Sequence, residues 1–227
     1  MTAHTCWTQK SYPKSLIQTE SELKYLHPSV HNKLKRAIDI VGALLGLGIT
    51  SIIAIPIALS MAISDPGPLL YSQIRCGLHG RPFRIWKFRS MVVGADKLKH
   101  LVKNEANGHI FKNTNDPRIT RLGAFLRRTS LDEFPQFWNV LMGDMSLVGT
   151  RPPTVDEVEN YETHHWERLN VRPGITGEWQ VNGRSAIKDF DAIVEMDVNY
   201  QRKWSLGYDL GLILKTLQVV FDKSGAC

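Results

Sequence analysis

The chain has 227 residues and a formal net charge of +6 at pH 7, which is enough sequence for one domain with a sizeable core but not for two full domains. The positive charge favours an anionic partner, which could be nucleic acid, an anionic membrane surface or a phosphorylated substrate. Cys6, Cys76 and Cys227 are far apart and show no metal-binding spacing, so neither a disulfide framework nor a zinc site is indicated.

Residues 1–32 are predicted to form a polar N-terminal tail. The first residues are polar, and the apolar segment of the chain begins only near Ile38. This distance is too long for a cleaved secretory leader, so none is expected.

Residues 33–64 contain the apolar segment. There is no charged residue between Asp39 and Asp65, and the run is long enough to cross a bilayer as one straight helix. Basic residues flank both ends, however, and this favours keeping both flanks in the cytoplasm. Ser51 and Pro56 lie near the middle, where a hydroxyl group and a missing backbone donor lower the cost of a helix break. We therefore predict a re-entrant membrane helix hairpin that breaks there, while a single-pass anchor fits the hydropathy equally well.

Residues 65–227 are predicted to form a cytosolic, membrane-associated catalytic domain of the α+β class, helix-rich with a short β-hairpin. The segments LLYSQIRCG and RPFRIWKF have the composition of strands and are separated by a turn at Gly77 to Gly80. The last helical pattern is apolar around much of its circumference, which is typical of a buried helix or of one on a membrane surface. Helical patterns are found at 92–105, 119–129, 131–141, 155–167, 187–204 and 208–222.

The segment RRTSLDEFPQFWNVL carries the strongest chemical signal. Ser130 and Glu133 have the spacing of a capping box, which would make the motif a purely structural helix start. Asp132 is not needed for a cap, and in the first helical turn the helix dipole would favour its ionised form. An ionised carboxylate can attack phosphorus, and Arg127 precedes it, as an anionic substrate requires, although arginines on a solvated face are commoner. Both readings stay open on these residues alone.

A second signal is the loop RPGITGEWQVNGRS at 172–185. Its glycines let the backbone approach a ligand, and Arg184 suits a phosphate or a nucleotide. An ordinary glycine-rich turn is the structural alternative.

Taken in order, these motifs resemble the monotopic phosphoglycosyl transferase family, also called bacterial sugar transferases. The resemblance covers residues 33–227 through KRAIDI, DPGPLLYSQIRCGLHGRPFRIWKFRSM, RLGAFLRRTSLDEFPQFWNVLMGDMSLVGTRP and VRPGITGEWQVNGRS. The chain departs from the family pattern at two places. The usual Ser-Pro pair of the membrane helix is represented by Ser51 followed by Ile52, and VGTRP replaces VGPRP.

The resemblance implies transfer of a sugar-1-phosphate from a UDP-sugar, of the hexose type, to a polyprenyl phosphate such as undecaprenyl phosphate, at the start of exopolysaccharide or other glycan assembly. Asp132 would attack the β-phosphate, UMP would leave, and the polyprenyl phosphate would take the phosphosugar from the enzyme. Glu133 would assist in acid/base work, and Asp132 and Glu133 would hold Mg²⁺, because a diphosphate needs its charge neutralised. The implied location is the cytoplasmic face of the bacterial inner membrane, in contact with its lipid.

Further residues match positions that the family uses to bind substrate. For each alone, a surface salt bridge is the structural alternative, and their joint occurrence favours a site. A non-catalytic membrane-anchored scaffold with a basic cytosolic face is the main alternative function. A nucleic-acid partner is not expected because no nucleic-acid-binding motif is present, and a homo-oligomer is compatible with the sequence. The substrate-binding residues implied are Lys87, Arg127, Arg151, Arg184 and Asp197.

Overall fold

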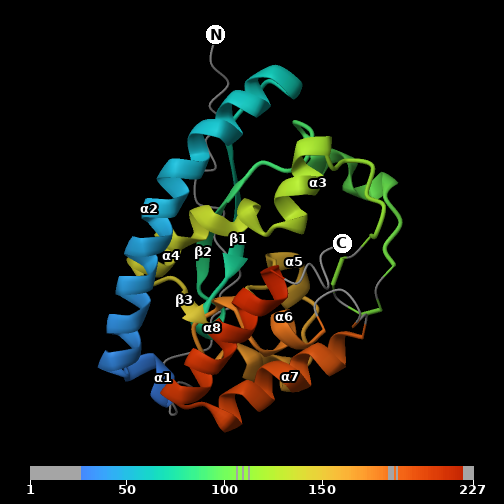
Figure 1. Cartoon of the computed structure of the whole chain (residues 1–227). Coiled ribbons are helices and arrows are strands. Elements are labelled where there is room, and N and C mark those ends of the chain that lie inside the picture. Colours follow the sequence, from blue (N-terminus) through green and yellow to red (C-terminus); the bar gives the residue numbers. More distant parts are fainter. Residues whose placement is uncertain are drawn as a thin grey trace.

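The computed structural model describes residues 27–105, 107–108, 110–111, 113–183, 187 and 189–221, so most of the predicted tail lies outside the described residues. The chain is helix-rich, as the sequence predicts, and it has two small sheets (Figure 1). The α-helices are α1 (Pro28–His31), α2 (Lys33–Ser64), α3 (Arg121–Arg128), α4 (Phe137–Met142), α5 (Val155–Val158), α6 (Glu178–Asn182), α7 (Phe190–Lys203) and α8 (Leu206–Phe221). The 3₁₀ segments are η2 (Leu78–Gly80), η3 (Ala95–Leu101), η4 (Leu131–Gln136) and η5 (Thr163–Leu169), and the strands are β1 (Leu70–Cys76), β2 (Pro82–Phe88), β3 (Ser146–Val148) and β4 (Gly174–Thr176).

The predicted β-hairpin is confirmed. Strands β1 and β2 pair antiparallel, from Leu70 opposite Phe88 to Cys76 opposite Pro82. Because side chains alternate between the faces of a strand, one face of this hairpin carries polar and charged groups together with Phe83 and Ile85. The residues of this face that line a large cavity are Tyr71, Gln73, Arg75, Ile85 and Lys87.

A short parallel pair, β3 and β4, was not predicted from the sequence. The two strands approach closely at Gly149 and Gly174, where an added Cβ atom on either glycine would collide with the backbone of the other segment. Only glycine fits such an approach. The pairing brings the loop that carries Arg151 beside the loop that leads from β4 into α6.

Three predicted helices are shorter or differently formed than expected. The pattern at 92–105 forms only the 3₁₀ segment η3, which begins after Gly94 in a left-handed conformation (φ 79°). The pattern at 131–141 divides into η4 and α4, with Pro135 inside η4, where it removes a backbone donor. The pattern at 155–167 divides into α5 and η5. The periodicity of apolar residues along the sequence does not reveal where these helices are interrupted.

The apolar segment is one helix, α2, of 32 residues, and it passes without interruption through Ser51 and Pro56. The predicted division into two half-helices is therefore not confirmed. The Ser51 hydroxyl donates to the Leu47 carbonyl oxygen (2.9 Å) inside the helix, and a single proline removes only one donor. The helix curves toward the rest of the molecule in its C-terminal part instead of breaking (Figure 1), and its length and composition would suffice to cross a membrane.

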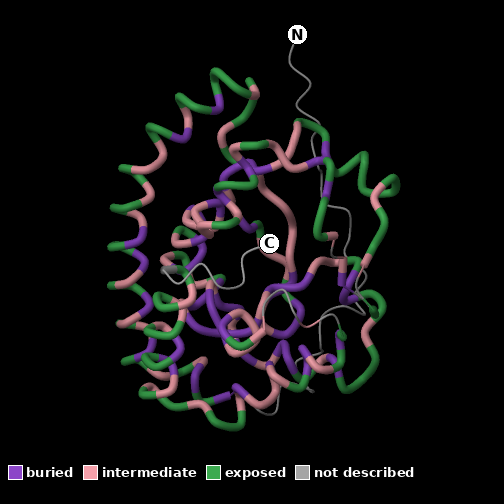
Figure 2. Tube along the Cα trace, turned by 45° about the vertical axis from the view of Figure 1, so that its right-hand side comes forward, coloured by how far each residue is buried: buried purple, intermediate pink, exposed green. Residues whose placement is uncertain are grey.

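One face of α2 packs against the domain along the whole helix. Ala43 packs in a cluster with Val140 and Met145, and further along Ile57 and Met61 pack with Phe88 and Leu126. The other face is exposed (Figure 2) and apolar, from Leu34 to Ile63. The helix therefore lies along the domain and does not project from it.

Polar contacts fix both ends of α2. Near the start, the buried Lys35 ammonium lies 2.6 Å from the Asp209 carboxylate of α8, which also accepts hydrogen bonds from Tyr200 and Trp204. Just after the end, Asp65 pairs with Arg89 at 2.8 Å. Both ends are thus attached to the same domain.

Candidate active site

The carboxylate pair lies in a 3₁₀ turn. Ser130 precedes η4 with a left-handed φ of 57°, and its side chain caps no backbone donor. The capping box that the spacing allowed is therefore wrong. The backbone N–H of Glu133 donates to the Ser130 carbonyl oxygen (3.2 Å), which tightens the turn and leaves the Glu133 side chain to be used elsewhere.

Glu133 is held by Lys87 of β2. The Lys87 Nζ atom lies 2.7 Å from Glu133 Oε1, and the two side chains are 26% and 27% exposed. Asp132 is more deeply buried, at 6% exposed. Both carboxylates reach the wall of a large cavity.

The large cavity has a volume of about 830 Å³ and extends from the hairpin face to the segment between Met91 and Arg118. Its size falls within the range of pockets that bind substrates or cofactors. A second cavity of about 130 Å³ adjoins it, because Arg75, Lys87, Glu133 and Arg151 line both. The chemistry-bearing residues therefore stand at the junction of two cavities.

Two arginines make this junction strongly cationic. Arg75 donates to the Pro152 carbonyl oxygen (3.0 Å) and to Gln73 (3.0 Å), and burial together with the nearby Arg151 cation lowers the pKa of Arg75 to about 10. Arg151 lies 3.4 Å from Glu157 and stacks over Trp179 with 5.8 Å to the ring centroid. An anion between the two guanidinium groups would relieve their repulsion.

Arg127 also reaches the large cavity. Its Nε atom donates to the Ser90 hydroxyl at 2.9 Å, and this contact holds the side chain beside the cavity. Lys87, Arg127 and Arg151 therefore gather with Asp132 and Glu133, as the sequence predicts.

Asp197 lines neither of the two cavities, and its contact with substrate stays a prediction. It is 1% exposed and accepts from Arg168 at 2.9 and 2.5 Å. Burial alone would lower the pKa of Arg168, but the neighbouring Tyr161 and Asp197 outweigh burial and raise it. Arg168 also donates to the Arg151 carbonyl oxygen (3.5 Å), so the pair supports the Arg151 loop from beneath. Arg184 lies outside the described residues.

Sequence reasoning missed four residues of the junction and the small cavity. Arg75 could have been predicted from the alternation of side chains along a strand. It lies on the same face of β1 as Tyr71, which is opposite Lys87. The other three come from two segments, η4 and α6, that only the fold brings together. They are Gln136, Trp179 and Gln180.

Asp132 and Glu133 offer the oxygen ligands that Mg²⁺ prefers. Glu133 also accepts a hydrogen bond from Lys87. This donor set fits a magnesium ion that shares its coordination with a diphosphate.

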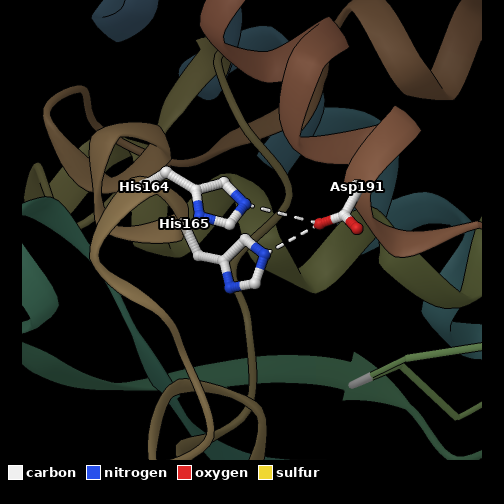
Figure 3. A group of neighbouring side chains, drawn as sticks. All are labelled: His164, His165 and Asp191. Carbon is white, nitrogen blue, oxygen red and sulfur yellow. Dashed lines mark hydrogen bonds and ion pairs between the residues drawn. The ribbon is translucent and has the colours of Figure 1, made fainter.

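Another group of potential metal ligands among the described residues is His164, His165 and Asp191, whose ligand atoms lie within 4.8 Å of one another (Figure 3). The Nδ1 atom of His165 accepts from the backbone N–H of Glu162 (3.0 Å). The neutral ring must then carry its proton on Nε2, which faces Asp191 at 2.9 Å. A protonated nitrogen cannot bind a metal, so His165 serves as a hydrogen-bonded link between η5 and α7.

Comparison with known proteins gives consistent matches. A family model described as bacterial sugar transferase matches residues 30–223. The galactosyl transferase CpsE of Streptococcus agalactiae is 52% identical over 198 residues, which are 86% of this chain and 44% of that protein. The undecaprenyl-phosphate galactose phosphotransferase of Salmonella typhimurium is 44% identical over 202 residues (85% and 41%). The UDP-glucose:undecaprenyl-phosphate glucose-1-phosphate transferase of Escherichia coli is 43% identical over 196 residues (83% and 40%). The chain thus spans less than half the length of these relatives.

Proposed function

The chain belongs to the bacterial sugar transferase family, and on that premise we propose that it transfers a sugar-1-phosphate from a UDP-sugar to undecaprenyl phosphate or a similar polyprenyl phosphate. One observation carries the proposal. The buried carboxylate Asp132 opens onto a cavity whose wall also presents Arg75, Lys87 and Arg151. A nucleophile beside clustered cations suits attack on an anionic phosphate ester.

The reaction proceeds in two displacements at one phosphorus atom. A carboxylate oxygen of Asp132 forms a bond to the β-phosphorus, the bond from that phosphorus to the bridging oxygen breaks, and UMP leaves with the electron pair. A phosphate oxygen of the polyprenyl phosphate then attacks the same phosphorus and restores the Asp132 carboxylate. The products are UMP and a polyprenyl diphosphate sugar, which begins the assembly of an exopolysaccharide or another glycan.

The other residues of the junction stabilise charge. Arg75 and Arg151 would bind the non-bridging oxygens of the diphosphate, where negative charge develops. Lys87 holds Glu133 beside Asp132, and Glu133 positions the reacting groups. When bound, Mg²⁺ held by Asp132 with Glu133 would neutralise part of the diphosphate charge. Loss of UMP release in chelator, with recovery on addition of magnesium, tests this part of the proposal.

The position of α2 supports a membrane association without a full crossing. Lys35 and Asp65, at its two ends, are both attached to the domain that carries Asp132. At about 1.5 Å per residue the helix is about 48 Å long, so a straight crossing would carry one of these attachments beyond the bilayer. We propose that α2 enters and leaves one leaflet, at the cytoplasmic face of the bacterial inner membrane, with its exposed apolar face toward lipid.

A non-catalytic scaffold is not favoured, because it requires no cavity that gathers carboxylates and cations. Release of UMP from a UDP-sugar in the presence of a polyprenyl phosphate tests the proposed function. Absence of UMP release from every UDP-hexose and UDP-acetamido-sugar supplied would contradict it.

A further inference from the structure

In the described part of the chain, three buried polar atoms without a hydrogen-bond partner belong to residues that line the small cavity. Among the described residues, five buried side-chain nitrogen and oxygen atoms have no hydrogen-bond partner. Three of them, Gln136 Nε2, Trp179 Nε1 and Gln180 Oε1, belong to residues that line this cavity. Gln136 is only 3% exposed. Leaving such groups unpaired is costly, and a ligand that reaches these residues of η4 and α6 would complete their hydrogen bonds.

The position of the cavity limits which part of a ligand can enter it. At about 130 Å³ it is smaller than the usual range for a whole ligand site, which starts near 300 Å³. Its shared wall with the large cavity contains Arg75, Lys87, Arg151 and Glu133, the groups proposed to contact the diphosphate and the reacting phosphorus. The small cavity therefore receives a group that is bonded directly to that phosphate.

The chemistry of the three atoms favours hydroxyl groups. Two primary amides and one indole N–H are neutral, and they present both donors and acceptors. A hydroxyl group donates and accepts, so it satisfies an amide in either orientation. In a UDP-sugar the hexose is bonded to the β-phosphate, whereas the uracil is separated from it by the ribose and the α-phosphate.

We propose that the small cavity is the sugar subsite, in which Gln136, Trp179 and Gln180 bind hydroxyl groups of the hexose while the large cavity holds the nucleoside. This inference rests on the proposed function. It assigns sugar recognition to three particular side chains of the two motifs that the sequence singles out, RRTSLDEFPQFWNVL and the loop at 172–185.

The test measures binding to the full-length protein with Asp132→Asn, so that the donor is not consumed. The probes are UDP-glucose, UDP-galactose and UMP, and the added variants are Gln180→Met and Trp179→Phe. The affinity for the hexose donor that binds best should fall about tenfold for each lost hydrogen bond. The affinity for UMP should stay the same, because UMP lacks the sugar. The melting temperature of the Gln180→Met variant without ligand should not fall, because the Gln180 Oε1 atom has no partner inside the protein.

Gln218→Met on α8 and Trp138→Phe on α4 are matched controls at exposed positions and should change none of these values. Equal weakening of UMP and the UDP-hexose would mean that the cavity binds the nucleotide, and unchanged affinity for both would mean that it binds neither part. A lower melting temperature of the Gln180→Met variant without ligand would make the groups structural. Each of these results would overturn the sugar-subsite inference but not the proposed function. If no UDP-sugar binds the Asp132→Asn protein and none yields UMP with the unmodified protein, the proposed function fails first and the sugar subsite with it.

Discussion

The ammonium of Lys87 lies 2.7 Å from the carboxylate of Glu133, although 46 residues separate them. This contact joins the β-hairpin to the 3₁₀ turn that carries Asp132. It replaces the helix cap that the spacing of Ser130 and Glu133 suggested, and it places a cation directly beside the proposed nucleophile.

We expect Lys87→Met and Glu133→Gln each to lower the rate of UMP release by about a hundredfold or more, because groups that position or exchange protons in a transition state contribute factors of this order. The double variant should lose less than the product of the two single losses, because residues in contact couple. Lys203→Met, at an exposed lysine, is the control and should retain full activity. Single losses that simply multiply would contradict a joint role.

Arg75→Gln should raise the KM for the donor by about 10-fold to 100-fold, because a hydrogen bond to a charged group contributes about 1.5 to 3 kcal/mol. Since the pKa of Arg75 is lowered to about 10, its charge is present at neutral pH and is lost as the pH rises through that value. Arg84→Gln is the matched control, because Arg84 is an exposed arginine of the same hairpin that bonds to Ser72 instead. Steady-state kinetics with both variants would refute the role if their KM values rose equally.

Asp197→Ala should destabilise the fold by about 3 to 5 kcal/mol, because it leaves the buried Arg168 charge without its partner. Asp191→Asn removes a carboxylate whose side chain is 71% exposed and should change stability much less. Chemical denaturation of both variants measures the difference. A small loss for Asp197→Ala would mean that the pair does not support the Arg151 loop.

Much of this architecture follows from local sequence signals. The hairpin was predictable because turn residues separate two strand-like runs, and α2 because its apolar run is long. The continuity of α2 could not be predicted, because Ser51 and Pro56 permit a break. The packing of Ala43 and Ile57 against the domain determines where the helix lies. Local pattern cannot reveal such contacts.

The site shows the same division. The Asp132 and Glu133 pair and the basic residues near it could be proposed from the sequence, because carboxylates beside arginines and lysines suit phosphate chemistry. The ion pair that buries Asp197 against Arg168 could not be predicted, because the motif around Asp197 does not reveal that partner. Gln136, Trp179 and Gln180 were missed because amides and an indole carry no signal until two distant segments meet around one cavity.

The topology of α2 can be tested with His31→Cys and Lys203→Cys, placed singly in a background without Cys6, Cys76 and Cys227. Both positions are exposed on the protein, so both should react with a membrane-impermeant thiol reagent after lysis. In intact cells neither should react if α2 lies as proposed, with both of its flanks in the cytoplasm. Labelling of either cysteine in intact cells would mean that the helix spans the membrane.

The most direct measurement of the central claim is capture of the covalent intermediate on Asp132. The protein is mixed with a UDP-sugar labelled in the β-phosphate, without acceptor, and the labelled peptide is mapped. Label should appear on Asp132 as UMP is released, and addition of polyprenyl phosphate should remove it. The Asp132→Asn protein should take up no label and should lose turnover, because an amide is not an anionic nucleophile. Label on another residue, or substantial turnover by the Asp132→Asn protein, would contradict the account.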